Sequence, residues 1–191
     1  MKRILILTVA LVSGGLFFSC LNTIQMANLQ QMPTNYAISP AFNEKQTWRT
    51  VVLPPAAGSM YNLSLTAGLY DYAGMVLLRT GRFTLVDRTV VDQLLDEQEF
   101  SWSGVVDQAT AVQLGKLLGA EAVMTINVTR IAHDNFWDDD PAQRDADLHV
   151  KIISVETSEV LYTSMGQGND FDGAEGALRM ALEVALIGLT K

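Results

Sequence analysis

Side chains that take part in catalysis are few in this chain, and none of them stands at a spacing typical of an active site. The two histidines, His133 and His149, are not at the spacing of a metal-binding pair. No serine stands in a Gly-x-Ser-x-Gly elbow, and no glycine-rich loop of the phosphate-binding type is present. The sequence therefore predicts a protein without enzymatic activity, without a cofactor and without a metal.

The densest cluster of potential metal ligands is the acidic segment at residues 133–147, HDNFWDDDPAQRDAD. Its carboxylates include those of Asp138, Asp139, Asp140, Asp145 and Asp147. Carboxylate oxygens suit Ca²⁺, but the ligand spacing of an EF-hand and its turn glycine are both missing. We therefore expect a solvated loop between two strands. Phe136 and Trp137 are unusual in such a loop, and we expect them either to contact a partner protein or to fold back on the domain.

The only cysteine, Cys20, follows a basic start, a short apolar segment and the small residue Ser19. This order is typical of an export signal, and the apolar segment is shorter than the about 20 residues that cross a bilayer. Ser-Cys resembles a lipobox, although Phe17 stands where leucine is usual. We expect residues 1–19 to be a signal peptide and Cys20 to carry acyl chains such as palmitate. The alternatives are a cleaved signal or an N-terminal anchor, either of them with an idle cysteine.

The charge of the exported chain excludes several classes of partner. Removal of residues 1–19 leaves 11 basic and 21 acidic side chains, a net charge of −10. Such a chain does not bind nucleic acid or anionic lipid by charge. More than one acyl chain would hold the protein stably on a membrane. Leu21 and Asn22 stand where an aspartate often retains lipoproteins at the inner membrane, so we expect an outer-membrane lipoprotein that faces the periplasm, with the inner membrane as the open alternative.

The remainder divides into a linker and one domain. Residues 21–46 are rich in Asn and Gln and carry no charge before Glu44. We expect residues 20–46 to be a lipidated tether that spans roughly 30 Å as a flexible coil. An arm packed on the domain or on a neighbouring protein is the alternative. Residues 47–191 are enough for a single domain with its own core.

Hydrophobic periodicity within residues 47–191 predicts alternating strands and helices. Leu65, Leu69, Tyr72 and Val76 recur at helical spacing, whereas the run from Val123 to Arg130 alternates as a half-buried strand does. Strands are expected at 47–53, 82–87, 123–130, 147–156 and 160–165, and helices at 65–79, 87–98, 107–119 and 171–191. The order β-α-β-α-α-β-β-β-α predicts a single α/β sandwich domain with helices packed on a mixed sheet.

Residues 77–131 resemble the centre of the CsgG family, the curli secretion lipoproteins and their relatives. The family pattern Phe-x-Val-Val-x-Arg, the Glu-Gln and Ser-Gly pairs, and Leu-Gly-x-x-x-Gly-Ala have counterparts at Phe83–Arg88 (with Leu85 in place of the first valine), Glu97-Gln98, Ser103-Gly104 and Leu114–Ala120. The resemblance implies a periplasmic domain of the TolB N-terminal, anticodon-binding-like type, which LpoB-type activators of penicillin-binding proteins also resemble. In the secretion channels of the family, a loop with Tyr, Asn and Phe narrows the pore. Tyr61 and Asn62 stand near that place without a phenylalanine, which implies a possible partner contact.

Three functions are compatible with these observations. We expect a non-catalytic envelope protein that acts in assembly or secretion through contacts with other envelope proteins, with homo-oligomers possible. One alternative is a subunit of a curli-type outer-membrane secretion channel, but each membrane hairpin of a channel needs about 20 residues. The two available intervals, 133–147 and 166–171, are shorter, and the first is strongly acidic. The other alternative, an LpoB-like activator, would need a longer tether.

Overall fold

The computed structural model of this chain describes residues 35–57, 63–97, 107–132, 144–171 and 173–190. The chain divides into two units, Met1–Thr34 and Asn35–Lys191. Only the second contains described residues, and the fold is that of this unit.

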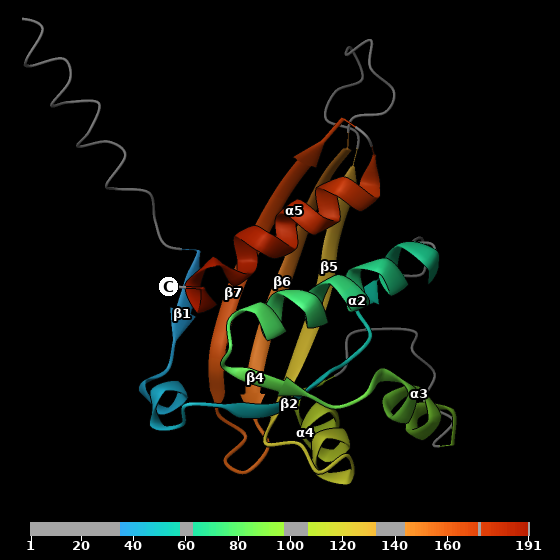
Figure 1. Cartoon of the computed structure of the whole chain (residues 1–191). Coiled ribbons are helices and arrows are strands. Elements are labelled where there is room, and N and C mark those ends of the chain that lie inside the picture. Colours follow the sequence, from blue (N-terminus) through green and yellow to red (C-terminus); the bar gives the residue numbers. More distant parts are fainter. Residues whose placement is uncertain (1–34, 58–62, 98–106, 133–143, 172, 191) are drawn as a thin grey trace, which may run out of the picture. The chain divides into compact units, whose positions relative to one another are not determined.

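Among the described residues, seven strands form one mixed sheet (Figure 1). The strands are β1 (Tyr36–Ile38), β2 (Trp48–Val52), β3 (Ala56–Ala57), β4 (Phe83–Leu85), β5 (Ala122–Ala132), β6 (Arg144–Ser154) and β7 (Val160–Asp170). Their order is β1-β7-β6-β5-β2-β4, and β3 also pairs with β5. The long strands β5, β6 and β7 form an antiparallel meander, whereas β2 runs parallel to both β5 and β4. The short strands β1 and β4 are thus the two edges.

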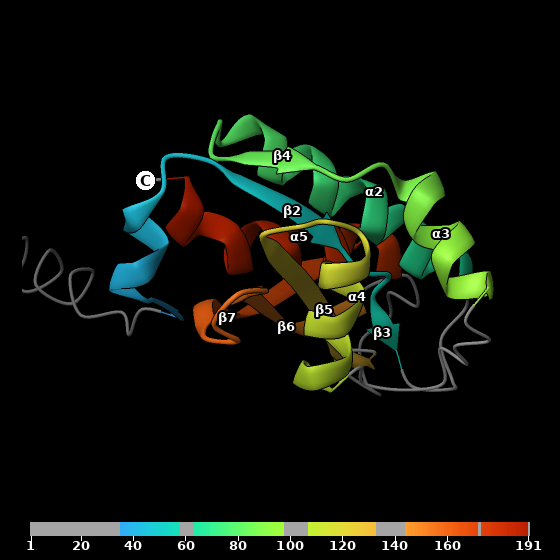
Figure 2. The same ribbon diagram turned by 90° about the horizontal axis from the view of Figure 1, so that it is seen from below.

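Helices lie on both faces of the sheet (Figure 2). They are α2 (Leu63–Arg79), α3 (Arg88–Glu97), α4 (Gln108–Leu117) and α5 (Ala174–Leu186), with 3-10 turns η1 (Pro40–Glu44) and η2 (Ile187–Leu189). The larger core joins α2 and α5 to the sheet and includes Met124, Val150 and Leu178. The smaller core on the other face joins α3 and α4 to the sheet through residues such as Val91 and Leu114.

These elements confirm the predicted α/β domain with a mixed sheet. Each expected strand and helix has a counterpart in the described residues, in the expected order. The alternation of apolar and polar residues predicted the long strands correctly. In β6, the apolar residues Leu148, Val150 and Ile152 are buried toward α5, while His149 and Lys151 face the other side of the sheet. The elements that were not predicted are the short ones β1, η1 and β3, while the predicted last helix ends at Leu186 and continues as the 3-10 turn η2.

The domain begins before the boundary that the sequence predicted. We expected the tether to end at residue 46, but the compact unit begins at Asn35. Tyr36–Ile38 pair with β7, and the ring of Phe42 is only 1% exposed. We call residues 35–46 the N-terminal arm. They correspond to the alternative of an arm packed on the domain, whereas the signal peptide and the rest of the tether lie outside the described residues.

The backbones of α5 and β7 lie directly against each other. A Cβ atom added to Gly166 would stand 1.8 Å from the carbonyl oxygen of Ala181, and one added to Gly168 would stand 2.1 Å from that of Ala177. Only glycine fits at either position of the strand. On the helix, Ala177, Ala181 and Ala185 recur every four residues and are fully buried, so the helix also presents small side chains opposite the two glycines.

The residues of β7 that face α5 decrease in size along the strand. They run from Tyr162 through Ser164 to Gly166 and Gly168. The Tyr162 hydroxyl donates a hydrogen bond to the carbonyl oxygen of Ala185, so it fills the wide end of the gap. The helix backbone therefore lies nearest the strand between Ala177 and Ala181, where only glycine stands opposite it.

We expect Gly168→Ala to lower the free energy of unfolding by about 1–3 kcal/mol, because the new methyl group must displace the backbone of α5. Chemical denaturation of the purified protein measures this loss. Gly68→Ala in α2 is the matched control, since its new methyl group would meet only Glu175 Oε1 at 3.5 Å. Helix propensity makes that variant neutral or slightly more stable. A Gly168→Ala variant as stable as the control would contradict the close packing.

We expect Leu114→Ala and Leu178→Ala each to lower the free energy of unfolding by about 2–5 kcal/mol, because each leaves a cavity in a core. Both side chains are 1% exposed, and they lie on opposite faces of the sheet. Leu117→Ala, at a position 58% exposed, should change the stability by less than about 0.5 kcal/mol. Equal effects at all three positions in denaturant titrations would show that the helix faces are wrongly assigned.

Candidate interaction site

The N-terminal arm is held on the domain by aromatic and cationic side chains. The Phe42 ring lies 6.2 Å from that of Trp48 and 5.9 Å from that of Phe83, measured between centroids. The guanidinium of Arg82 stands 4.1 Å above the Phe42 ring. It also donates hydrogen bonds to the carbonyl oxygens of Phe42 at 3.0 Å and Lys45 at 3.1 Å. These contacts fix the point at which the preceding chain joins the folded unit.

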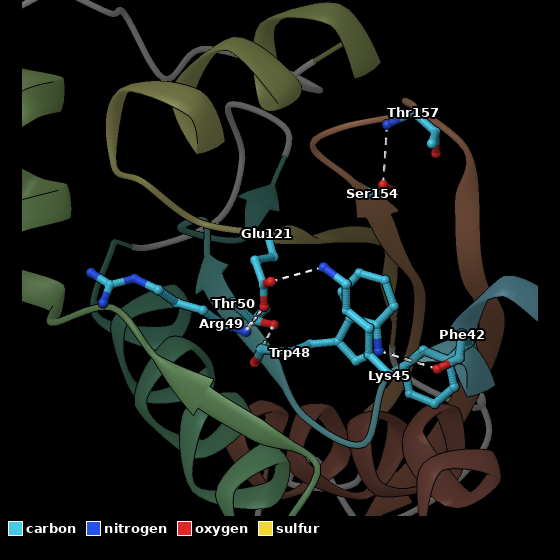
Figure 3. A network of polar contacts seen from close by, with 8 residues as sticks. All are labelled: Phe42, Lys45, Trp48, Arg49, Thr50, Glu121, Ser154 and Thr157. Atoms are coloured by element: carbon cyan, nitrogen blue, oxygen red, sulfur yellow. Dashed lines mark hydrogen bonds and ion pairs between the residues drawn. The ribbon is translucent and has the colours of Figure 1, made fainter.

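Glu121, the residue before β5, connects the arm with β2 (Figure 3). Its Oε1 lies 2.8 Å from Lys45 Nζ, and its Oε2 accepts a hydrogen bond of 3.0 Å from the backbone N–H of Arg49. The Arg49 N–H and then Lys45 hold the pKa of Glu121 below its usual value. Lys45 also lies over the ring of Trp48, whose Nε1 donates to the Phe42 carbonyl. Because Lys45 and Glu121 are both about two-fifths exposed, their ion pair positions the arm and adds little stability.

A groove of about 600 Å³ lies at the β4 edge, between α2 and the segment from β4 to α3. Its apolar lining includes Met75 and Leu78 of α2 together with Leu85 and Val86. Met75 is 41% exposed and Leu78 is 54% exposed, which is unusual for large apolar side chains side by side. We call this feature the α2–β4 groove.

Arg88, the arginine of the CsgG-like motif, lines the α2–β4 groove. Its guanidinium lies 2.6 Å from Asp71 of α2 and 3.3 Å from Asp92 of α3, and it stands 4.7 Å above the Tyr70 ring. Burial, and then the charge of Asp92, raise the pKa of Tyr70 to about 12, so this hydroxyl stays protonated. The arginine therefore joins α2 to the start of α3.

A second group of exposed apolar side chains lies near the opposite edge of the sheet, at β1. The group consists of Ile38, Met180, Val184 and Ile187, each between 36% and 46% exposed, and we call it the α5 edge patch. The three residues from α5 and η2 stand at positions i, i+4 and i+7 and so share one helix face. Strand β1 joins them because the Tyr36 ring covers Gly188, and Ile38 points to the same side of the strand.

The predicted contact residues are not placed by the structure. Cys20, Tyr61, Asn62, Phe136 and Trp137 all lie outside the described residues. The two surfaces above were missed because no motif marks them. Their only signal is apolar side chains, such as Leu78 and Val184, on the outer faces of their helices.

The described parts of the acidic segment are used within the sheet. Asp147 accepts a hydrogen bond of 2.8 Å from Arg130, and Asp145 accepts one from Asn169. His149 lines a small cavity with Lys151 and Asn127. Within the described ranges, no group of three His, Cys, Asp or Glu residues gathers where it could hold a metal ion. None of the described helices is long and apolar enough to span a bilayer.

Comparison with solved structures finds the same fold in other proteins. A PelC dodecamer from Paraburkholderia phytofirmans is 11% identical, with a TM-score of 0.53, and the match covers 81% of this chain and 94% of that one. LpoB from Escherichia coli is 14% identical, with a TM-score of 0.50, over 70% of this chain and 66% of that one. At such low identities the likeness concerns the fold alone.

Comparison of the sequence itself identifies the family. No curated protein sequence matches the chain significantly. Residues 21–135, more than half of the 191 residues, match the family described as curli production assembly/transport component CsgG. This match extends the resemblance noted at residues 77–131 in both directions. The chain belongs to the CsgG family.

Proposed function

We propose that the protein is a lipid-anchored, periplasm-facing protein of the outer membrane that acts without catalysis, by binding other envelope proteins and copies of itself. The observation that carries this proposal is the pair of exposed apolar surfaces, the α2–β4 groove and the α5 edge patch, on a small domain. Apolar side chains gathered on a soluble surface are typical of sites that bind other proteins. The family description, which names assembly and transport, supports the same role.

Self-assembly has independent support from the comparisons. PelC of Paraburkholderia phytofirmans, which shares the fold, is a dodecamer. That assembly belongs to PelC, and for this chain it is part of the proposal. The charge of −10 on the processed chain also restricts partners to proteins rather than nucleic acid.

The tether sets the reach of the domain in this proposal. If Cys20 carries the lipid and the domain begins at Asn35, residues 21–34 connect the lipid to the domain. Fully extended, this segment spans at most about 50 Å, and as a flexible coil it averages about 20 Å. The domain then works close to the membrane that anchors it, which disfavours an LpoB-like activator of a distant synthase.

A subunit of a secretion channel is the second candidate, because the family description includes transport. The strand ends make it less favourable. Strand β5 ends at Ala132 and β6 begins at Arg144, while β7 ends at Asp170 and α5 begins at Ala174. Both intervals are far shorter than the about 20 residues of a membrane hairpin.

We expect Cys20→Ala to move the protein from the detergent-soluble membrane fraction to the soluble fraction, because the variant has no site for acyl chains. Cell fractionation followed by immunoblotting measures this shift. Ser39→Ala, a polar change of similar size inside the N-terminal arm, serves as the control and should leave the protein in the membrane fraction. If the Cys20→Ala variant stays fully membrane-bound, the lipid anchor is wrong.

We expect the purified lipoprotein, reconstituted in planar bilayers, to produce no ion current, because lipid alone attaches it to the membrane. Recordings at several protein concentrations, with a known pore-forming protein as the positive control, make this test. Reproducible conductance from the protein alone would overturn the proposal in favour of the channel.

A further inference from the structure

We propose that a small cavity on the face of the sheet that carries α4 binds the carboxyl-terminal residue of a peptide whose last side chain is small and apolar. The cavity is lined by residues of β5, β6 and the start of α4, and we call it the β5–β6 cavity. It shares no described residue with the α2–β4 groove or the α5 edge patch. Binding at this site is therefore independent of self-assembly through those two surfaces.

The pairing of β5 with β6 gathers polar side chains at the β5–β6 cavity. Asn127 is opposite His149, and Thr125 is opposite Lys151. All four residues line the cavity. Because alternate residues of a strand share a face, these four lie on the side of the sheet away from α5, which is the side that carries α4 (Figure 2).

The polar wall of the cavity can bind an anion. In the described part of the chain, the side chains of Asn127, His149 and Lys151 form no hydrogen bond or ion pair. No carboxylate lines the cavity within the described residues. Asp147, which precedes His149 on the same face of β6, is held by Arg130 at 2.8 Å. An amide, an imidazole and an ammonium group can therefore donate hydrogen bonds to the oxygens of a ligand.

The other wall of the cavity is apolar. Leu53, Pro54 and Ile153 line it, and the side chains of Leu53 and Ile153 are each 1% exposed. The volume of the cavity is about 90 Å³, far below the roughly 300–1,000 Å³ of a pocket that encloses a whole small molecule. A carboxylate joined to one small side chain, as at the end of a peptide, matches this size and both walls.

The apolar wall favours a peptide end over an inorganic anion. Phosphate could accept hydrogen bonds from the polar wall, but it would leave the apolar wall uncovered. A terminal alanine would place its carboxylate on the donors and its methyl group against the apolar wall, with the rest of the peptide outside the cavity. Gln108 lines the cavity from α4, and its side-chain amide donates a hydrogen bond to the Ser158 carbonyl oxygen. This fixed boundary favours a small last side chain.

Saturation-transfer NMR on the detergent-purified full-length lipoprotein tests this site, with N-acetyl-alanine as the probe. We expect the protein to transfer saturation to the alanine methyl group, with a Kd of about 1–10 mM, because one residue makes few contacts. N-acetyl-alanine amide, which carries no charge, should bind about tenfold more weakly. Lys151→Met should weaken the binding of N-acetyl-alanine about threefold to tenfold, and Lys151→Arg should restore most of it. Lys116→Met, at the other end of α4, is the matched control and should leave the Kd unchanged.

Each outcome decides for or against the site. No saturation transfer at about 10 mM probe, or equal binding of the acid and the amide, would disprove the carboxylate ligand. An unchanged Kd in the Lys151→Met variant would place the probe elsewhere and overturn the β5–β6 cavity as its site. Inorganic phosphate, added as a competitor, should displace the probe only when it is in excess. Displacement by phosphate at or below the Kd of the probe would indicate a general anion site and overturn the peptide ligand.

Discussion

The backbone of α5 rests on the backbone of β7, and the larger core depends on this approach. Gly166 and Gly168 remove the side chains that would hold the helix away, and Ala177 and Ala181 do the same on the helix. Because α5 lies so close, Leu178 and Leu182 are buried in the larger core. The same position leaves Met180 and Val184 on the outer flank, where they form the α5 edge patch. One local constraint thus sets both the core and an exposed surface.

Much of this fold could be predicted from local pattern. Apolar residues alternate in β5 and β6 and recur at helical spacing in α2 and α4. Each pattern indicates that one face of the element is buried, because hydrophobic periodicity follows burial. Gly115, in the pattern at Leu114–Ala120, packs closely, because a Cβ there would stand 2.5 Å from the Val123 side chain. Asp107, where the third helix was expected to begin, caps α4 because its carboxylate accepts a hydrogen bond from the Thr110 N–H. In these cases sequence neighbours decide the structure.

Structure that depends on contacts between residues far apart in the chain was harder to predict from the sequence. The N-terminal arm has no period of its own, and it is ordered by β7 and by Arg82, which come much later in the chain. Strand β1 is only three residues long, so its pairing leaves no recognisable pattern. The two apolar surfaces could not be predicted for the same reason. Whether Leu78 or Ile187 is exposed depends on how distant elements pack around it. The contact residues expected from sequence lie in segments outside the described residues.

The way in which the N-terminal arm is attached gives the domain a defined response to mechanical load. Any tension on residues 1–34 is carried first by Asn35, whose side-chain amide donates to the carbonyl oxygens of Met165 and Val184. The next resistance is the three-residue pairing of β1 with β7, which can give way pair by pair. Behind it, Phe42 is held between Trp48 and the guanidinium of Arg82. The arm can therefore lengthen under a weak pull while the sheet and its helices stay folded.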